Sequence, residues 1–191
     1  MTGVQTCASS DLGQSASQVL DKTAAVVSNK SGVQASFVIN SKQYGTTSGT
    51  IAVKGKKFHA ETKEASVWFD GKTQWTYVKQ NDEVNVNNPS QADLQAINPY
   101  NFIYLYKQGY TATMTKSGQN YQVTLKGKGK GIQEMVITIN QKTYVPSQIK
   151  MLQNKQWTTI TVSGFKKANL SDGLFRFNRK SYPHAEIIDL R

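Results

Sequence analysis

The sequence predicts a mainly β protein with a few helices, in which a large, strongly curved antiparallel sheet of about 11 strands carries the helices on its concave face. Three observations lead to this prediction. Short segments that alternate apolar and polar residues recur along the chain, with turn residues between them. The composition, with 14 Gly and nine Tyr among 191 residues, is typical of β-rich proteins. The helical segments are too few to cover both faces of so large a sheet, which argues against an alternating βαβ arrangement.

Length and composition indicate a single domain over residues 14–191. A chain of 191 residues that is 38% hydrophobic can bury a substantial core. Residues 1–13 fit none of the later patterns and have neither the basic nor the apolar region of a signal peptide. We interpret them as a non-native N-terminal artefact, so the single cysteine, Cys7, carries no redox information, and we expect a native signal peptide to be missing. No run of residues is long and apolar enough to span a bilayer.

The first half of the domain predicts one helix followed by six strands. Apolar residues recur at helical spacing from Ser15 to Ser28, and Gly32 ends the segment. Alternating apolar residues then predict strands at 33–39, 49–54 and 56–62, two more in a hairpin within 67–77, and a short one at 83–87.

The hairpin has its turn at Asp70-Gly71, because glycine readily adopts the positive φ of a tight turn and aspartate can bond its own backbone. Its register has two solutions. A two-residue turn puts Trp68 on the same face as Trp75, whereas a three-residue loop puts Phe69 there. We favour the three-residue loop, because it gathers the apolar side chains on one surface.

The second half predicts two short helices and about five further strands. Ser90 caps a helix that reaches Ile97, and the apolar and aromatic residues from Tyr100 to Tyr106 predict a second helix, which Gly109 ends. Strands are predicted at 110–116, 121–126, 135–139, 146–152 and 157–165, with a last one at 175–177.

The sequence contains no recognisable catalytic or metal-binding arrangement. His59 and His184 are the only histidines, and neither belongs to a nucleophile–base pattern, so we predict no catalytic residues and no enzyme. Two histidines without a usable cysteine do not make a dedicated zinc site, and nothing indicates a cofactor.

The net charge of +11 raises the question of an anionic partner. The run from Lys126 to Gly131 alternates lysine with glycine, but it lacks the spacing of a phosphate-binding loop. We interpret the lysines as a solvated surface and predict no nucleic-acid partner. The positive charge could also steer the protein toward anionic lipid head groups or an acidic partner, and this alternative stays open.

The aromatic residues of the hairpin and of residues 100–106 have two interpretations. In the simpler one they form a packed core. In the other, helices that are apolar on both sides lie over an open sheet as a movable lid, and the cavity beneath them suits an acyl chain or another lipid.

Three stretches of the chain carry a resemblance to a known family. They are Gly49-Thr50-Ile51-Ala52-Val53-Lys54 with Phe58, the hairpin Trp68-Phe69-Asp70-Gly71-Lys72-Thr73-Gln74-Trp75-Thr76-Tyr77, and Asn98-Pro99-Tyr100-Asn101-Phe102. They resemble the outer-membrane lipoprotein carrier (LolA-like) family over the range from about Ser15 to Phe177, and the hairpin is the most specific part. The resemblance implies a half-open β-barrel closed by a helical lid.

The resemblance also implies a carrier without catalysis. Such carriers take a triacylated lipoprotein from an inner-membrane lipoprotein-releasing transporter, shield its acyl chains across the periplasm and deliver it to an outer-membrane acceptor. We therefore expect a periplasmic, monomeric carrier with these partners. The family's Arg-Pro pair after Val-Lys is replaced here by Gly55-Lys56, so no lid latch is carried over. Ala60 replaces a bulky aromatic residue, which would enlarge the cavity.

The predicted acyl-chain site is an apolar surface shared by the strands and the lid. Its members are Phe37, Ile39, Ile51, Val53, Phe58, Phe69, Trp75, Tyr77, Ile97, Phe102 and Leu105. Weak, non-directional contacts and a lid of low local stability would allow release. Two alternatives stay open: a periplasmic binding domain for another lipid or glycolipid, and a structural or interaction domain without a ligand.

Overall fold

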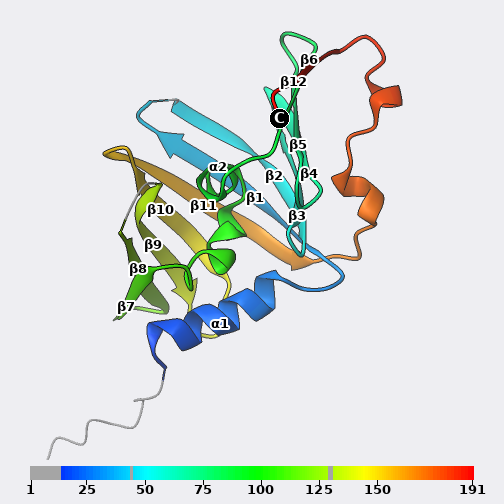
Figure 1. The fold of residues 1–191 in the computed structure, drawn as a ribbon. Helices are drawn as coiled ribbons and strands as arrows, with labels where there is room; N and C mark the ends of the chain where they lie inside the picture. The colour runs from blue at the N-terminus through cyan, green and yellow to red at the C-terminus, as the bar shows by residue number, and fades with distance from the viewer. Residues whose placement is uncertain (1–13, 44, 129–130) are drawn as a thin grey trace, which may run out of the picture.

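A single 12-stranded sheet curves around the helices in the computed structural model, which describes residues 14–43, 45–128 and 131–191 (Figure 1). The segment interpreted as an artefact, residues 1–13, and two residues of the lysine–glycine run, 129–130, lie outside the described residues. The strand order is β12-β6-β5-β4-β3-β2-β1-β11-β10-β9-β8-β7. Because β12 and β7 stand at opposite ends of this order, the barrel is half-open. The predicted fold class is confirmed.

The strands are joined mainly by hairpins. Their bounds are β1 Val33–Ser41, β2 Gly45–Lys54, β3 Lys57–Thr62, β4 Ala65–Phe69, β5 Gln74–Val78, β6 Glu83–Asn87, β7 Tyr110–Ser117, β8 Asn120–Gly127, β9 Ile132–Asn140, β10 Pro146–Gln153, β11 Gln156–Lys167 and β12 Glu186–Asp189. The neighbouring strands are antiparallel, except that β12 is parallel to β6. Strands β1 to β11 lie where the sequence predicts them, and most extend by one to four residues beyond the predicted bounds.

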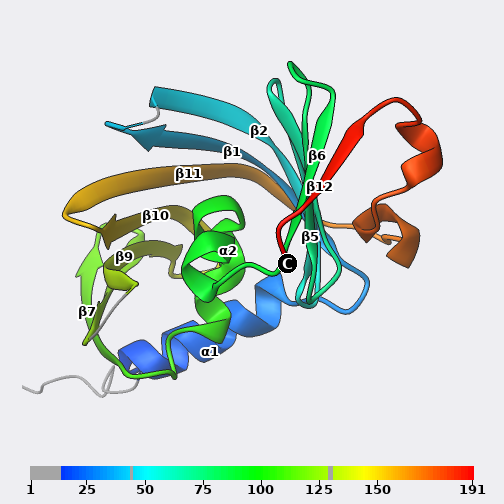
Figure 2. The same ribbon diagram turned by 45° about the horizontal axis from the view of Figure 1, so that its top comes forward.

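The concave side of the sheet holds three helices: α1 Ala16–Val27, α2 Gln91–Ile97 and the 3₁₀-helix η1 Pro99–Tyr104. Figure 2 shows α2 inside the curve of the sheet and α1 across its open end. Both α-helices begin with a capping box. Ser15 and Ser90 each accept a hydrogen bond from the third helical residue, and the side chains of Gln18 and Asp93 bond back to the cap backbone. The second short helix that the sequence predicts, after Pro99, is present as the 3₁₀-helix η1 rather than as an α-helix.

The register of the β4–β5 hairpin differs from the one that we favoured. Trp68 pairs with Trp75, and Phe69 pairs with Gln74, so the two tryptophans share a face of the sheet. The loop consists of residues 70–73, and its even number of residues gives the same facing as the two-residue turn. The three-residue loop was the wrong choice.

The last strand also lies elsewhere than predicted. Residues 175–177 do not form a strand: they follow the short 3₁₀-helix η2 Asp172–Phe175, and another, η3 Arg179–Ser181, precedes β12. Phe175 is fully buried against Ala52 and Leu170 on the outer face of the sheet. The C-terminal segment therefore crosses the convex face before β12 joins the sheet edge (Figure 2).

Lysines of the β2–β3 hairpin hold the beginning of this C-terminal segment. The Nζ of Lys54 donates to the backbone oxygen of Leu170 over 2.8 Å and lies 3.2 Å from the carboxylate of Asp172. Lys57 lies 3.7 Å from the same carboxylate. The bond from Lys54, and then the two lysine charges, lower the pKa of Asp172, so the carboxylate stays ionised at neutral pH.

Gly49 in β2 has no room for a side chain. A Cβ built on it would lie 2.0 Å from the backbone oxygen of Glu61 in β3 and 3.0 Å from the ring of Phe37. Backbone atoms of a paired strand cannot move without disturbing the ladder. We therefore expect Gly49→Ala to lower the free energy of unfolding by about 2–3 kcal/mol, measured by urea denaturation.

The matched control for this substitution is Gly173→Ala, because a Cβ at Gly173 meets no atom within 4 Å. Its free energy of unfolding should change by less than about 0.5 kcal/mol. Equal stability of the two variants would contradict the close approach of β2 and β3.

Candidate functional site

The concave face gathers most of the residues predicted to contact acyl chains. The main core cluster contains Phe37, Ile51, Val53, Phe58, Phe69, Phe102 and Leu105, and Ile39 and Ile97 pack against it. The ring centroids of Phe58 and Phe69 lie 5.5 Å apart. The fold thus brings strands β1 to β4 and the helices α2 and η1 onto one apolar surface. The contact of this surface with a ligand stays a prediction.

The prediction that Trp75 and Tyr77 share this surface is wrong. Both residues lie on the outer face, in a separate cluster with residues of β6 and of the C-terminal segment. The ring of Tyr182 packs against Tyr77 there, with the two centroids 4.5 Å apart. The hairpin register is the cause, since it turns Trp75 to the side of Trp68.

The opposite wall of the concave face comes from strands β8 to β10, which the predicted site leaves out. Its fully buried side chains are Val123, Leu125, Met135, Ile137, Ile139 and Ile149. Helix α1 adds Val19 and Leu20, both 0% exposed. The alternation of apolar residues predicts strands β8 to β10. A local pattern of this kind does not tell which strands face each other across a curved sheet.

Residues 91–104, which comprise α2 and η1, form the lid. The side-chain hydrogen bonds of the lid, among the described residues, stay within residues 90–108. Three of them join Asn98 to Tyr100, Gln95 to Pro99, and Asn101 to Gln91. Toward the sheet the lid presents apolar side chains such as Leu94 and Phe102. The lid is therefore held together by hydrogen bonds and held against the sheet mainly by non-directional apolar contact.

Two hollows open on either side of the lid. The first, of about 180 Å³, lies between the lid and the turns of the β2–β3 and β4–β5 hairpins; its lining includes Lys56, Phe69, Gly71, Leu94 and Tyr104. The second, of about 400 Å³, lies between the lid and strands β7, β9 and β10; its lining includes Ala92, Leu105, Tyr110, Ile132 and Gln153. The larger hollow is within the size range of small-ligand pockets. Both mark the seam along which the lid meets the sheet.

A charged contact bridges this seam at the hairpin side. The Nζ of Lys56 lies 5.7 Å from the ring centre of Tyr104, which is within the range of a cation–π interaction. Lys56 was not predicted to hold the lid. It belongs to Gly55-Lys56, the pair that stands where the resembled family pattern has Arg-Pro.

A second polar contact ties the chain after the lid to α1. The hydroxyl of Tyr106 donates a hydrogen bond to the carboxylate of Asp21, and Lys107 lies 3.4 Å from the same carboxylate. Burial, followed by the bond to Asp21, raises the pKa of Tyr106, so its hydroxyl remains a donor. Asp21 therefore anchors the chain just after the lid, outside the lid's own set of hydrogen bonds.

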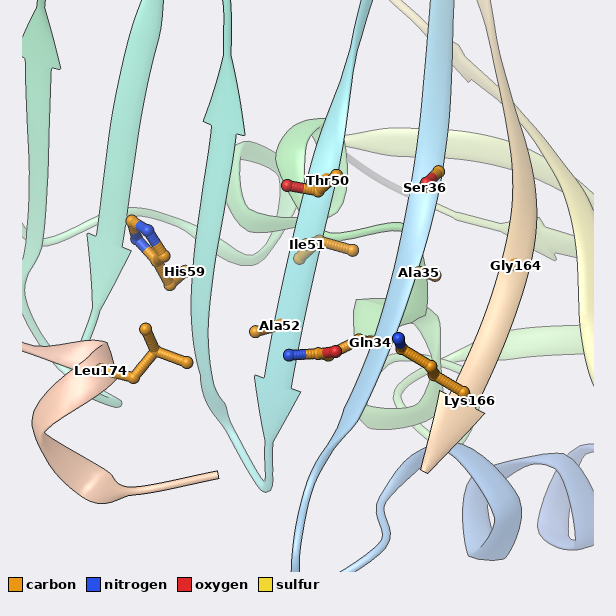
Figure 3. Close-up of a pocket in the computed structure, with 10 residues that line it drawn as sticks. All are labelled: Gln34, Ala35, Ser36, Thr50, Ile51, Ala52, His59, Gly164, Lys166 and Leu174. Atoms are coloured by element: carbon orange, nitrogen blue, oxygen red, sulfur yellow. The ribbon is translucent and has the colours of Figure 1, made fainter. Parts of the chain in front are cut away.

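A further hollow of about 400 Å³ lies on the outer face of β1, β2 and β11 (Figure 3). Gln34 and Lys166 bound one side of it, and His59 and Leu174 bound the other. It lies on the opposite face of the sheet from the lid, so it is not the predicted acyl-chain site.

No group of three or more His, Cys, Asp or Glu is placed to hold a metal ion within residues 14–43, 45–128 and 131–191. Within the same ranges, no helix combines the length and the hydropathy needed to cross a membrane. His59 is held by structural contacts. Its Nδ1 lies 3.0 Å from the backbone oxygen of Val67, its Nε2 lies 3.1 Å from the carboxylate of Glu61, and its ring stacks on Trp68.

Comparison with known proteins identifies the family. The family model described as "Outer membrane lipoprotein carrier protein LolA" matches residues 7–155, which is most of the chain. No curated protein matches the chain in sequence.

Solved structures share the fold at low sequence identity. An uncharacterised conserved protein from Thermus thermophilus superposes with a TM-score of 0.60 at 15% identity, over 92% of this chain and 99% of that one. A LolA superfamily protein from Nitrosomonas europaea gives a TM-score of 0.51 at 12% identity, over 86% and 98% of the two chains. MucB gives 0.50 at 11% identity, over 90% of this chain and 64% of its own. At such identities the likeness shows the fold alone.

The curved sheet, its helical lid and the match of the family model agree with one another. The family is one of carriers rather than enzymes, which fits the lack of a catalytic pattern in the sequence. The chain therefore belongs to the LolA-like outer membrane lipoprotein carrier family.

Proposed function

We propose that this protein is a periplasmic carrier that shields the acyl chains of lipoproteins on its concave face and delivers them to the outer membrane. The observation that carries the proposal is the bonding of the lid. Its hydrogen bonds close on themselves, and its sheet-facing side is apolar. Such a lid can move away from the sheet as a unit, because this movement breaks no backbone or side-chain hydrogen bond between the described residues of the lid and of the sheet.

The energetics suit a carrier that has to release its cargo. When the lid is closed, Phe102 and Tyr100 already fill the apolar surface, and they are 0% and 1% exposed. An acyl chain that displaces them gains about 0.8 kcal/mol per buried CH₂, but the lid loses part of its own burial. The net affinity is the difference between these two terms, so it stays moderate and permits transfer.

The proposed partners follow from the family. They are an inner-membrane lipoprotein-releasing transporter, which loads the carrier, and an outer-membrane acceptor, which unloads it. A monomer is sufficient for this exchange. The net charge of +11 would steer the protein toward anionic lipid head groups or an acidic partner surface.

Uptake of the fluorescent fatty acid cis-parinaric acid tests acyl-chain binding, and mass spectrometry of lipids that co-purify from the native host tests the cargo. We expect saturable uptake and an acylated lipoprotein or its lipopeptide in the purified protein. Recovery of a glycolipid or another lipid would assign that cargo instead. Absence of any uptake would leave an interaction domain with a fully packed core.

Lys56→Gln is expected to loosen the lid slightly. The substitution removes the cation–π contact with Tyr104, which is worth about 0.5–1 kcal/mol at an exposed site. Amide hydrogen exchange in α2 should therefore become about two- to fivefold faster. Lys72→Gln, an exposed lysine on the neighbouring hairpin, is the control and should leave α2 unchanged. Equal exchange rates in both variants would show that Lys56 does not hold the lid.

A further inference from the structure

Several buried polar atoms of the helices and of β5 have no hydrogen-bond partner within the described part of the chain. Among the described residues these atoms are the hydroxyl oxygens of Tyr100 and Thr23 and the side-chain amide oxygens of Gln95 and Gln74. Tyr100, Thr23 and Gln95 are at most 1% exposed, and they come from the three helices η1, α1 and α2. Gln74 pairs with Phe69 and so lies on the same face of the sheet as that ring. Folded proteins seldom leave such atoms unpaired, because each has lost its bonds to water.

Two of these atoms belong to the lid and have opposite hydrogen-bonding roles. The hydroxyl of Tyr100 stays protonated, since burial raises the pKa of this tyrosine, so it is an available donor. The Nε2 of Gln95 donates to the backbone oxygen of Pro99 over 3.1 Å, which leaves its Oε1 as an available acceptor. The ring of Tyr100 packs edge-on against Phe165 of β11, with centroids 6.2 Å apart, so the tyrosine faces the sheet and not the solvent.

A pure hydrocarbon ligand would leave the Tyr100 hydroxyl and Gln95 Oε1 without hydrogen-bond partners. A chain joined to its head group through an ester or an amide brings a carbonyl oxygen, which accepts from a hydroxyl, and the amide also brings an N–H, which donates to a carbonyl oxygen. These groups match the unpaired donor and acceptor of the lid.

We propose that the Tyr100 hydroxyl donates a hydrogen bond to the carbonyl that links a bound acyl chain to its head group, and that Gln95 Oε1 accepts from the N–H where this linkage is an amide. The inference rests on the proposed function, because it assigns a chemical class to the ligand of the same face. The class is an acyl chain attached through a carbonyl, preferred over an alkyl chain of equal length without one.

A matched pair of ligands isolates the carbonyl. 1-Palmitoylglycerol and 1-O-hexadecylglycerol have the same head group and a chain of 16 carbons, and they differ only in the ester carbonyl. Each is titrated against the protein in competition with cis-parinaric acid. The wild-type protein should bind the ester about tenfold more tightly than the ether, the effect of one hydrogen bond to an otherwise unpaired group.

Tyr100→Phe should remove this preference. It should weaken binding of the ester about tenfold and leave binding of the ether within about twofold. The hydroxyl has no hydrogen-bond partner among the described residues, so the variant should fold with an unchanged or higher Tm. Tyr77→Phe, which removes a hydroxyl from the outer face of the sheet, is the control and should keep the preference.

The outcomes separate this inference from the proposed function. Equal binding of ester and ether by the wild-type protein, or a preference that survives in Tyr100→Phe, would overturn the inference while acyl binding stands. If neither glycerol lipid nor cis-parinaric acid binds, the proposed function fails and the inference fails with it.

Discussion

Phe102→Asp is expected to abolish acyl-chain uptake while leaving the sheet folded. Phe102 lies in η1, is 0% exposed and belongs to the main core cluster. A carboxylate at this position would have to give up its hydration, so the lid could close neither on the sheet nor on a bound chain. The ladders of the sheet should survive, because the lid makes its hydrogen bonds within itself.

Far-UV circular dichroism and a titration with cis-parinaric acid measure the two parts of this result. We expect a spectrum like that of the wild-type protein and an affinity at least about 100-fold lower. Gln119→Asp is the control, because it places the same charge at an exposed position in the turn between β7 and β8, outside the lid and the two hollows beside it, and it should bind like the wild-type protein. Undiminished binding by Phe102→Asp, with a native spectrum, would refute the assignment of residues 91–104 as a lid.

Because Phe69 and Trp75 lie on different faces of the β4–β5 hairpin, their replacement should affect acyl-chain uptake differently. Phe69→Ala removes an apolar side chain from the concave face, where it packs against Phe58. It should weaken acyl-chain uptake about tenfold and lower the free energy of unfolding by about 3 kcal/mol. Trp75→Ala removes a larger side chain from the outer face, so it should leave uptake unchanged while still lowering stability.

Both variants are titrated with cis-parinaric acid at a temperature at which urea denaturation shows them to be folded. The ratio of the two affinities is the informative quantity, because loss of stability alone would act on both. Comparable weakening in Trp75→Ala and Phe69→Ala would show that the tryptophan contributes to the acyl-chain site, contrary to its position in the structure.

The same hairpin shows where local sequence patterns stop being informative. The three-residue loop was favoured because it gathers the apolar side chains of the hairpin on one surface. In the structure both faces are covered, because Phe177 and Tyr182 pack on Trp68, with ring centroids 5.5 and 5.6 Å from it. These partners lie more than 100 residues further along the chain. No count of apolar residues around the turn could reveal them.

Elements that depend on local chemistry were predictable. The capping residues Ser15 and Ser90 mark the beginning of α1 and α2, and alternation of apolar residues locates β1 to β11. The strand β12 was missed, because Glu186–Asp189 is short, carries no alternation and depends on pairing with the distant β6. A strand was predicted at 175–177 instead. In the structure Phe175 packs on the outer face of the sheet, where it is buried against Ala52.

The candidate site was predicted in part for a similar reason. Residues of β1 to β4 and of the lid were identified by their apolar character and by the resemblance to the family. The wall formed by β8 to β10 depends on how far the sheet curves, and Ile137 and Leu125 carry no local sign that they join the same core cluster as Phe102. The unpaired hydroxyl of Tyr100 becomes visible only when its surroundings are known.

The central claim is that an acyl chain binds between the lid and the concave face of the sheet. Photo-crosslinking with a palmitic acid that carries a diazirine on its chain, followed by peptide mass spectrometry, tests this claim most directly. We expect adducts on concave-face and lid residues such as Phe58, Phe69 and Phe102, and excess palmitic acid should suppress them. Adducts confined to the outer face, around Trp75 and Tyr182, or no adducts that palmitic acid suppresses, would contradict it.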